Sequence, residues 1–322
     1  MRAMRLTRLD GPDALELADV PEPSSADQLV VEIHAAGVGF PDLLMSRGRY
    51  QVRPEPPFIP GVELAGVVLH APDGSAFQPG DRVAGPAPIG TWAEVALATP
   101  AVTFPIPEGM SYAQATALVN YQSAYFGLVE RGSAIAGETV LVHGAAGGVG
   151  SAAVDVATAL GLQVIAVARG EEKLATARSL GAKHCFDVEG DWLSEVKALT
   201  DKRGVDLVFD PVGGDGFLNS VRSLAPLGRL LVIGFAGGTI PEVKVNRLLL
   251  RNSSVVGVAW GEFIRRDPAM PQRVGKALAE LWDAGKLNPL VGATFPLEQA
   301  ADALREIEGR RAIGKIVLLI RE

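Results

Sequence analysis

Hydrophobic positions change their spacing twice along the chain, and these changes predict how the chain is organised. Up to about Pro107 the sequence holds short apolar runs broken by proline and glycine: LVVEIHAAGV, ELAGVVLH, DRVAG and WAEVAL. Short strands joined by turns produce this spacing. The first third of the chain therefore predicts a compact, β-rich, barrel-like domain.

From about Ser111 to Gly257 the apolar runs alternate with stretches of helical spacing. Six runs are expected to form buried strands: TVLVHG, QVIAVA, HCFDV, DLVFD, LLVIGF and SVVGVAW. Strands that alternate with helices predict a doubly wound parallel sheet. The remaining residues predict a helix that ends near Gly285, another over 297–307 and a last strand, KIVLLI. We expect this C-terminal segment to pack back onto the first domain.

The first strand of the predicted sheet leads into a run of very small residues, in VLVHGAAGGVGSAAVDVATALG. Between Gly144 and Gly150 only Val149 carries more than a methyl group, and helical spacing begins after the turn. In a strand, tight turn and helix of this kind, backbone N–H groups and the helix dipole can bind a phosphate. The candidate pyrophosphate contacts are Ala146, Gly147, Gly148, Val149 and Gly150.

This loop matches a dinucleotide fingerprint only in part. Ala145 stands where the first glycine of the usual motif would be, and no Gly-Lys-Ser/Thr follows as in a P-loop. A structural turn that binds nothing is therefore the alternative interpretation.

The end of the second strand is where a dinucleotide fold selects between NAD and NADP. An acidic residue there binds the ribose 2′-hydroxyl of NAD, whereas a basic residue accommodates the 2′-phosphate of NADP. Here Arg169 ends the strand and Lys173 follows, although Glu171 and Glu172 lie between them. The pattern favours NADP(H), with ordinary solvated charges as the alternative.

Composition excludes several other classes of protein. The chain has 322 residues, enough for two domains, and its net charge of −7 disfavours nucleic acid as a partner. No apolar run is long enough for a membrane span, and the N-terminal residues do not resemble a signal peptide, so we expect a cytoplasmic protein. With Cys185 as its one cysteine, the chain cannot form an internal disulfide.

Several motifs, in this order and spacing, resemble the medium-chain dehydrogenase/reductase superfamily, and in particular its zinc-free quinone oxidoreductase (zeta-crystallin-like) branch. They are GVGFPDLLMSRGRYQ, PFIPGVELAG, PGDRVAG, ALVNYQSAY, AAGGVG, DPVGG and RRAIGKIVLL. The resemblance implies an α/β protein in which a Rossmann-type doubly wound parallel sheet is inserted in a β-rich, GroES-like catalytic domain. The expected parts are a catalytic domain over 1–118, an NADP(H)-binding domain over 119–258, and a segment over 259–322 that completes the catalytic domain.

The resemblance also bears on metal binding. Zinc enzymes of the superfamily have a cysteine and a histidine at two positions that here hold Gly39 and Val62. A catalytic zinc needs about three protein ligands, so we expect no metal. We expect the neighbouring Asp42 and Glu63 to form hydrogen bonds in the domain cleft. Quinone reductases usually have asparagine at the position of Gly39, which leaves the substrate's identity open.

Further site residues follow from the resemblance alone. Tyr50 matches a catalytic tyrosine of related enoyl-thioester reductases, or lines the cleft. Asn120 and Ser123, with Tyr121 between them, match a tract beside the nicotinamide and its ribose. Phe235 matches a residue whose backbone faces the nicotinamide carboxamide, and otherwise belongs to the core. Arg310 matches an arginine that reaches the 2′-phosphate, and otherwise is a surface charge.

Three functions stay open at this point. The leading one is NADPH-dependent hydride transfer to quinones or other α,β-unsaturated carbonyl acceptors without a metal. The second is an enoyl-thioester (enoyl-CoA) reductase, for which Arg47, Arg49 and Arg53 around Tyr50 offer a basic entrance. The third is a low-turnover NADPH-binding structural or redox-sensing protein. In each case we expect a homodimer, because the sixth strand of the sheet is left as an uncovered edge.

Overall fold

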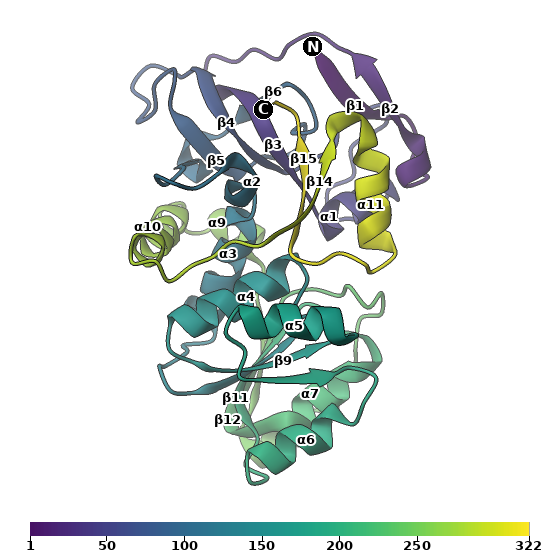
Figure 1. The fold of residues 1–322 in the computed structure, drawn as a ribbon, viewed down its shortest axis with the longest axis vertical. Helices are drawn as coiled ribbons and strands as arrows, with labels where there is room; N and C mark the ends of the chain where they lie inside the picture. Colours follow the sequence, from purple (N-terminus) through teal and green to yellow (C-terminus); the bar gives the residue numbers. More distant parts are fainter. Residues whose placement is uncertain (322) are drawn as a thin grey trace. The chain divides into compact units, whose positions relative to one another are not determined.

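The computed structural model describes residues 1–321, which form two compact units (Figure 1). Unit 1 contains Met1–Val119, Pro271–Gly275 and the chain from Pro289 onwards. Unit 2 contains Asn120–Met270 and Lys276–Asn288. The C-terminal part of the chain therefore belongs to the same unit as the N-terminal part.

Unit 1 is built on a mostly antiparallel sheet of seven strands. Their order is β14 (Val291–Pro296), β15 (Lys315–Leu319), β3 (Leu29–Val38), β4 (Glu63–His70), β5 (Arg82–Pro86) and β7 (Phe104–Pro105), with β6 (Val95–Ala98) also paired to β3. A separate pair is formed by β1 (Arg2–Leu6) and β2 (Leu15–Asp19). Because β15 pairs with β3, the chain from Pro289 onwards returns to unit 1, whereas most of residues 259–288, which the sequence analysis assigned to the same segment, lie in unit 2.

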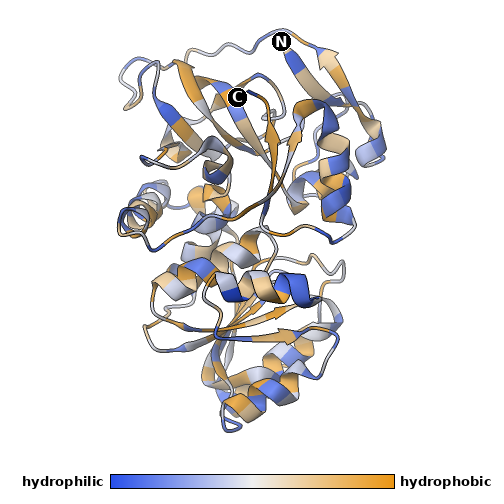
Figure 2. Cartoon of the chain, in the orientation of Figure 1, coloured by the Kyte–Doolittle hydropathy of each residue, from blue (hydrophilic) through white to orange (hydrophobic). Residues whose placement is uncertain are grey.

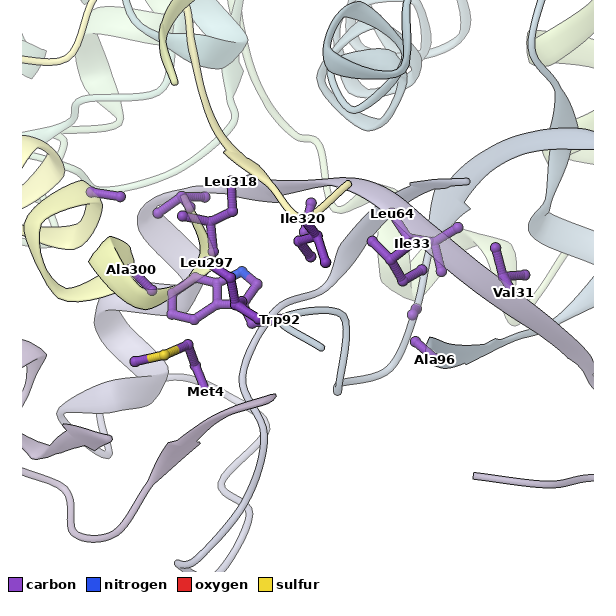
Figure 3. Close-up of a cluster of buried hydrophobic side chains, with 14 of the residues drawn as sticks. Met4, Val31, Ile33, Leu64, Trp92, Ala96, Leu297, Ala300, Leu318 and Ile320 are labelled. Atoms are coloured by element: carbon purple, nitrogen blue, oxygen red, sulfur yellow. The ribbon is translucent and has the colours of Figure 1, made fainter. Parts of the chain in front are cut away.

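Short helices complete unit 1. They are η1 (Pro12–Ala14), α1 (Phe40–Ser46), η2 (Pro100–Val102), α2 (Tyr112–Ala115), η5 (Leu297–Gln299) and α11 (Ala300–Glu308). The core joins both ends of the chain: Figure 3 shows Trp92 beside Met4 and Leu297. Trp92 is fully buried, and its indole N–H donates to the carbonyl of Gly37 at 3.1 Å. This bond satisfies the one polar group that the ring carries into the core.

Unit 2 is built on a six-stranded sheet in which all neighbours are parallel. The order is β10 (His184–Asp187), β9 (Gln163–Ala168), β8 (Thr139–His143), β11 (Val205–Asp210), β12 (Leu224–Val232) and β13 (Ser254–Gly257). All six predicted strands are confirmed, and the doubly wound fold with them. Since β8 lies between β9 and β11, the order reverses at β8, and ligands of such sheets bind outside the strand ends at this point.

The helices of unit 2 follow the strands. They are α3 (Leu118–Tyr125), the π-helix η3 (Phe126–Arg131), α4 (Gly148–Ala159), α5 (Glu171–Ser179), α6 (Trp192–Leu199), η4 (Gly214–Gly216), α7 (Phe217–Ser223), α8 (Asn246–Arg251), α9 (Trp260–Ile264) and α10 (Met270–Asp283). Both α3 and α10 are divided between the units. Figure 2 colours the strands mainly orange and much of α5 blue. Burial agrees, because α5 buries only Leu174 and Ala177. Within residues 1–321, no helix has the length and apolar character that crossing a bilayer requires.

Candidate functional site

The loop between β8 and α4 exposes backbone donors at the start of a helix. Gly144 has a φ of +57°, in the left-handed region, and its carbonyl accepts the N–H of Gly147 at 2.9 Å. Gly147 is the N-cap of α4, and the methyl groups of Ala145 and Ala146 are buried. The first N–H groups of a helix have no intrahelical acceptor. The loop can therefore offer N–H groups to an anion at this point.

The glycines of this loop have different tasks. A Cβ at Gly150 would overlap the backbone of Gly144, so the close packing of helix on loop requires glycine there. A Cβ at Gly147 would have only the carbonyl oxygen of Gly144 within 4 Å, at 3.5 Å. The protein itself thus leaves the space beside Gly147 open. The residues present fit a pyrophosphate that approaches the backbone closely.

Two cations and two carboxylates lie together at the ends of β9 and β10. Burial, and next the charge of Arg169, lower the pKa of the Lys173 ammonium, which places the two cations near each other. Arg169 Nε lies 3.1 Å from Glu189 Oε1, and Asp187 Oδ2 accepts the N–H of Gly170 at 2.9 Å. This end of the strand suits a phosphate that binds between cations, with an acidic residue already in contact with one of them.

The sequence identified the cations here but missed Glu189. It drew attention to Glu171 instead, which pairs with Arg178 at 2.5 Å on the same helix. The signal lies in the strand order: β10 pairs with β9 in parallel, with Asp187 opposite Ala168. Residues that follow Asp187 therefore lie beside those that follow Ala168.

The tract Asn120–Ser123 lies on α3. Tyr121 donates its hydroxyl to Asp155 Oδ2 at 2.6 Å, and the same oxygen accepts the N–H of Asn288 at 2.7 Å. Burial raises the pKa of both Tyr121 and Asp155, so this pair fastens α3 to α4 and to the chain after α10. By contrast Asn120 Oδ1 is buried without a hydrogen-bond partner, and Ser123 is half-buried. A buried acceptor without a partner is rare and suits a ligand that donates to it.

Directly after this tract the helix widens into the π-helix η3. Nothing in the apolar spacing of the sequence indicates this change. π-Helical turns are rare and are found frequently at functional sites. The change from α-helix to π-helix thus lies directly beside the tract that the sequence predicts to contact the nicotinamide.

Phe235 follows the carboxyl end of β12, and so lies on the same side of the sheet as the β8–α4 loop, which follows the carboxyl end of β8. Asp210 ends β11, and its Oδ1 accepts the N–H groups of Val212 and Gly213 at 2.8 and 2.9 Å. The chain after β12 packs on this turn: Gly237 N–H donates to Val212 at 2.8 Å, and a Cβ at Gly213 would lie 3.0 Å from the ring of Phe235. With 36% of its surface exposed, Phe235 is not a core residue.

Tyr50 and Arg310 belong to unit 1. Tyr50 is half-buried in a bend after α1, and its backbone carbonyl accepts from Arg53 Nε at 3.1 Å. Arg310 is exposed just after α11, with a φ of +56°. In unit 2 the glycine loop, Arg169, Lys173 and Phe235 thus all follow the carboxyl ends of the parallel strands. Tyr50 and Arg310, by contrast, lie in unit 1.

Unit 1 holds a buried charged cluster, of which the sequence analysis named Asp42 and Glu63 but missed Lys315. Lys315 on β15 forms an ion pair with Glu63 on β4, and both side chains are almost completely buried. Asp42 Oδ2 accepts the N–H of Gly39 at 2.8 Å and so caps α1. Burial, and next the charge of Glu63, raise the pKa of Asp42 to about 7.

This cluster surrounds the position at which zinc enzymes have a cysteine ligand. A Cβ at Gly39 would lie 3.8 Å from Lys315 Nζ and 3.8 Å from Asp42 Oδ2. The described part of the chain contains no group of three histidine, cysteine, aspartate or glutamate side chains that could hold a metal ion. What the structure places beside Gly39 is a paired lysine.

Comparison with known proteins agrees with the architecture of both units. Residues 25–108 match the alcohol dehydrogenase GroES-like domain, and residues 148–280 match the zinc-binding dehydrogenase family. The rat protein "Quinone oxidoreductase-like protein 2" (Rattus norvegicus) is 38% identical over 99% of this chain and 92% of its own length.

Two solved structures are similar over nearly the whole chain. A probable oxidoreductase from Mycobacterium abscessus has a TM-score of 0.92 and 42% identity, covering 99% of each chain. The quinone oxidoreductase of Thermus thermophilus, solved alone and in complex with NADPH, has a TM-score of 0.85 and 37% identity, covering 99% of this chain and 100% of its own.

A parallel six-stranded dinucleotide-type sheet combined with a GroES-like unit defines the medium-chain dehydrogenase/reductase superfamily. Within it, this chain belongs to the quinone oxidoreductase family. The resemblance inferred from the sequence motifs is confirmed.

Proposed function

We propose that this protein is an NADPH-dependent reductase that transfers a hydride to quinones or other α,β-unsaturated carbonyl acceptors without a metal. The observation that carries the proposal is a pair of cations, Arg169 directly after β9 and Lys173 in the first turn of α5, that follow the strand next to β8, whose loop to α4 is open. The loop suits a pyrophosphate, and the cations suit a 2′-phosphate. The relative from Thermus thermophilus, solved in complex with NADPH, supports the choice of cofactor.

We assign the cofactor contacts in unit 2 as follows. Ala146, Gly147, Gly148, Val149 and Gly150 would hold the pyrophosphate through their backbone. Arg169 and Lys173 would pair with the 2′-phosphate. Asn120, Ser123 and Phe235 would contact the nicotinamide and its ribose. The buried Asn120 Oδ1, which has no partner in the protein, would accept a hydrogen bond from the cofactor there. Arg310, as a further contact of the 2′-phosphate, stays a prediction from the resemblance.

The nicotinamide supplies the hydride, so the protein has to orient the acceptor and stabilise the charge that develops on its oxygen. We assign the second task to the hydroxyl of Tyr50. One donor is enough for a quinone, because the ring of the hydroquinone anion delocalises its charge. An enoyl thioester would depend on the donor more strongly.

The arginines around Tyr50 favour quinones over coenzyme A thioesters. Arg47 is engaged within unit 1, where it pairs with Glu308 and donates to the carbonyl of Asp10. Arg53 donates to the carbonyl of Tyr50. Two of the three arginines that could form a basic entrance for coenzyme A therefore already have partners in the protein.

The assembly stays a prediction: we propose a homodimer. β13 is an edge of the sheet, as predicted, and pairs only with β12 among the described strands. An uncovered strand edge can pair with its copy in a second chain.

Calorimetric titration with NADPH and NADH tests the cofactor assignment. A partly exposed charge-assisted contact contributes roughly 1.5–3 kcal/mol, so NADPH should bind about ten- to a hundredfold more tightly than NADH. Arg169→Ala should remove most of this preference. Arg178→Ala is the matched control, since Arg178 lies on α5 but pairs with Glu171. Equal affinities for both cofactors in the wild-type protein would refute the assignment.

A further inference from the structure

The ion pair between Arg169 and Glu189 joins the two strand ends at which the proposed 2′-phosphate site lies. Arg169 Nε is 3.1 Å from Glu189 Oε1, and the side chains are 59% and 69% exposed. Arg169 directly follows β9, and Glu189 comes two residues after the end of β10, with which β9 pairs. A ligand that arrives at Arg169 from solvent therefore meets the Glu189 carboxylate as well.

The position of Glu189 is fixed by its backbone. Val188 N–H donates to the carbonyl of Ala168 at 2.9 Å, which extends the pairing of the two strands past the end of β10. Asp187 Oδ1 accepts the N–H of Glu189 at 2.9 Å, while its Oδ2 accepts the N–H of Gly170 at 2.9 Å. One carboxylate thus ties together the turn that carries Arg169 and the turn that carries Glu189.

The same contact works against a phosphate on Arg169. A guanidinium in ion-pair contact with a carboxylate has part of its charge already compensated, which weakens its attraction for a phosphate. A phosphate monoester carries a charge of about −1.5 to −2, so a carboxylate within contact distance of its arginine also repels it. A dinucleotide with a free 2′-hydroxyl has no such charge, and can bind while the ion pair stays in place.

We propose that Glu189 is a specificity-determining residue that competes with the 2′-phosphate of the cofactor for Arg169, and so limits the preference for NADPH over NADH. This inference rests on the proposed role of Arg169. Glu171, though nearer to Arg169 in sequence, pairs with Arg178 and serves as the reference.

Calorimetry on the full-length protein tests the proposal, with NADPH, NADH and 2′,5′-ADP as ligands. Glu189→Gln should tighten NADPH and 2′,5′-ADP about three- to tenfold, since exposed ion pairs are weak but the repulsion is lost too, and should leave NADH unchanged. Glu171→Gln should change NADPH affinity less. In the double variant Arg169→Ala/Glu189→Gln, the gain over Arg169→Ala alone should be smaller than the gain of Glu189→Gln over the wild-type protein, because only the lost repulsion remains.

Other outcomes overturn the proposal. Unchanged or weaker NADPH binding by Glu189→Gln would mean that Glu189 does not compete, or that it orients Arg169 for the phosphate. An equal gain in affinity for NADH, or an equal gain in NADPH affinity in Glu171→Gln, would mean that the effect comes only from the changed net charge of the protein. If the wild-type protein shows no NADPH preference and Arg169→Ala no effect, the cofactor assignment fails together with this inference. A preserved preference with a silent Glu189→Gln refutes the inference alone.

Discussion

Lys315 and Glu63, which are 252 positions apart in the sequence, form a buried ion pair across the sheet of unit 1. Lys315 begins β15 and Glu63 begins β4, and β3 runs between these two strands. The pair passes over Gly37 of β3, where any Cβ would overlap the Glu63 carboxylate. One charge pair thus connects the last strand with the strand after α1, across the first long strand.

Removal of one partner should therefore be costly for stability. Lys315→Met leaves the Glu63 carboxylate buried without its counter-ion, which destabilises a protein by about 3–5 kcal/mol. Chemical denaturation should show this loss. The double variant Lys315→Met/Glu63→Gln, which carries no buried charge here, should recover much of it. A loss below about 1 kcal/mol for Lys315→Met would contradict a buried, paired lysine.

Asp42 should make stability depend on pH. Its pKa is raised from 3.8 to about 7, mainly by burial. Between these values the unfolded state releases the proton while the folded state keeps it, so the folded state loses stability as pH rises from about 4 to about 7. Asp42→Asn keeps an oxygen acceptor for Gly39 and should lack this decline. The check is the free energy of unfolding of both proteins across this range, and parallel curves would contradict the raised pKa.

Gly147→Ala tests whether a ligand approaches the β8–α4 loop. The added methyl group would meet only the Gly144 carbonyl, at 3.5 Å, so the fold should tolerate it within about 1 kcal/mol. A pyrophosphate against this backbone would be displaced, and we expect NADPH and NADH to bind at least about tenfold more weakly, by the same factor for both. Wild-type affinity in a stably folded Gly147→Ala variant would place the pyrophosphate elsewhere.

Tyr50→Phe tests the role of the tyrosine and sorts the substrates. The hydroxyl is assigned to the acceptor, so NADPH affinity should stay nearly unchanged. Quinone reduction should also persist, because a hydroquinone anion can take its proton from water. Reduction of enones or enoyl thioesters should fall at least about tenfold, since a lost hydrogen bond to a developing oxyanion is costly. If steady-state rates of both reactions stay at wild-type values, the hydroxyl of Tyr50 takes no part in the reaction.

The sequence predicted what depends on local pattern. Period and residue type were sufficient for the six parallel strands, for the tight turn after β8 and for the cations at the end of β9. Glycine at positions 147 and 150 indicates that another group approaches the backbone closely there, so the sequence also predicted the close contacts of this loop.

What the sequence could not predict depends on which strands become neighbours. Glu189 meets Arg169 only because β10 pairs with β9 in a fixed register. Nothing in the sequence around Lys315 indicates its ion pair with Glu63, because that pair depends on the positions of β15 and β4 on either side of β3. Tyr121 stands between Asn120 and Ser123 in the sequence, but its hydroxyl donates to Asp155, on a helix 34 positions further along the chain.

The most direct test of the central claim is NADPH oxidation by the full-length protein against matched quinones, enones and an enoyl-CoA, with and without a metal chelator. We predict that the protein reduces quinones, faster with NADPH than with NADH at low cofactor concentration. The chelator should leave these rates unchanged. Tight NADPH binding without turnover of any acceptor would contradict the account and favour a binding protein. Turnover that the chelator abolishes and zinc restores would contradict the assignment of metal-free chemistry.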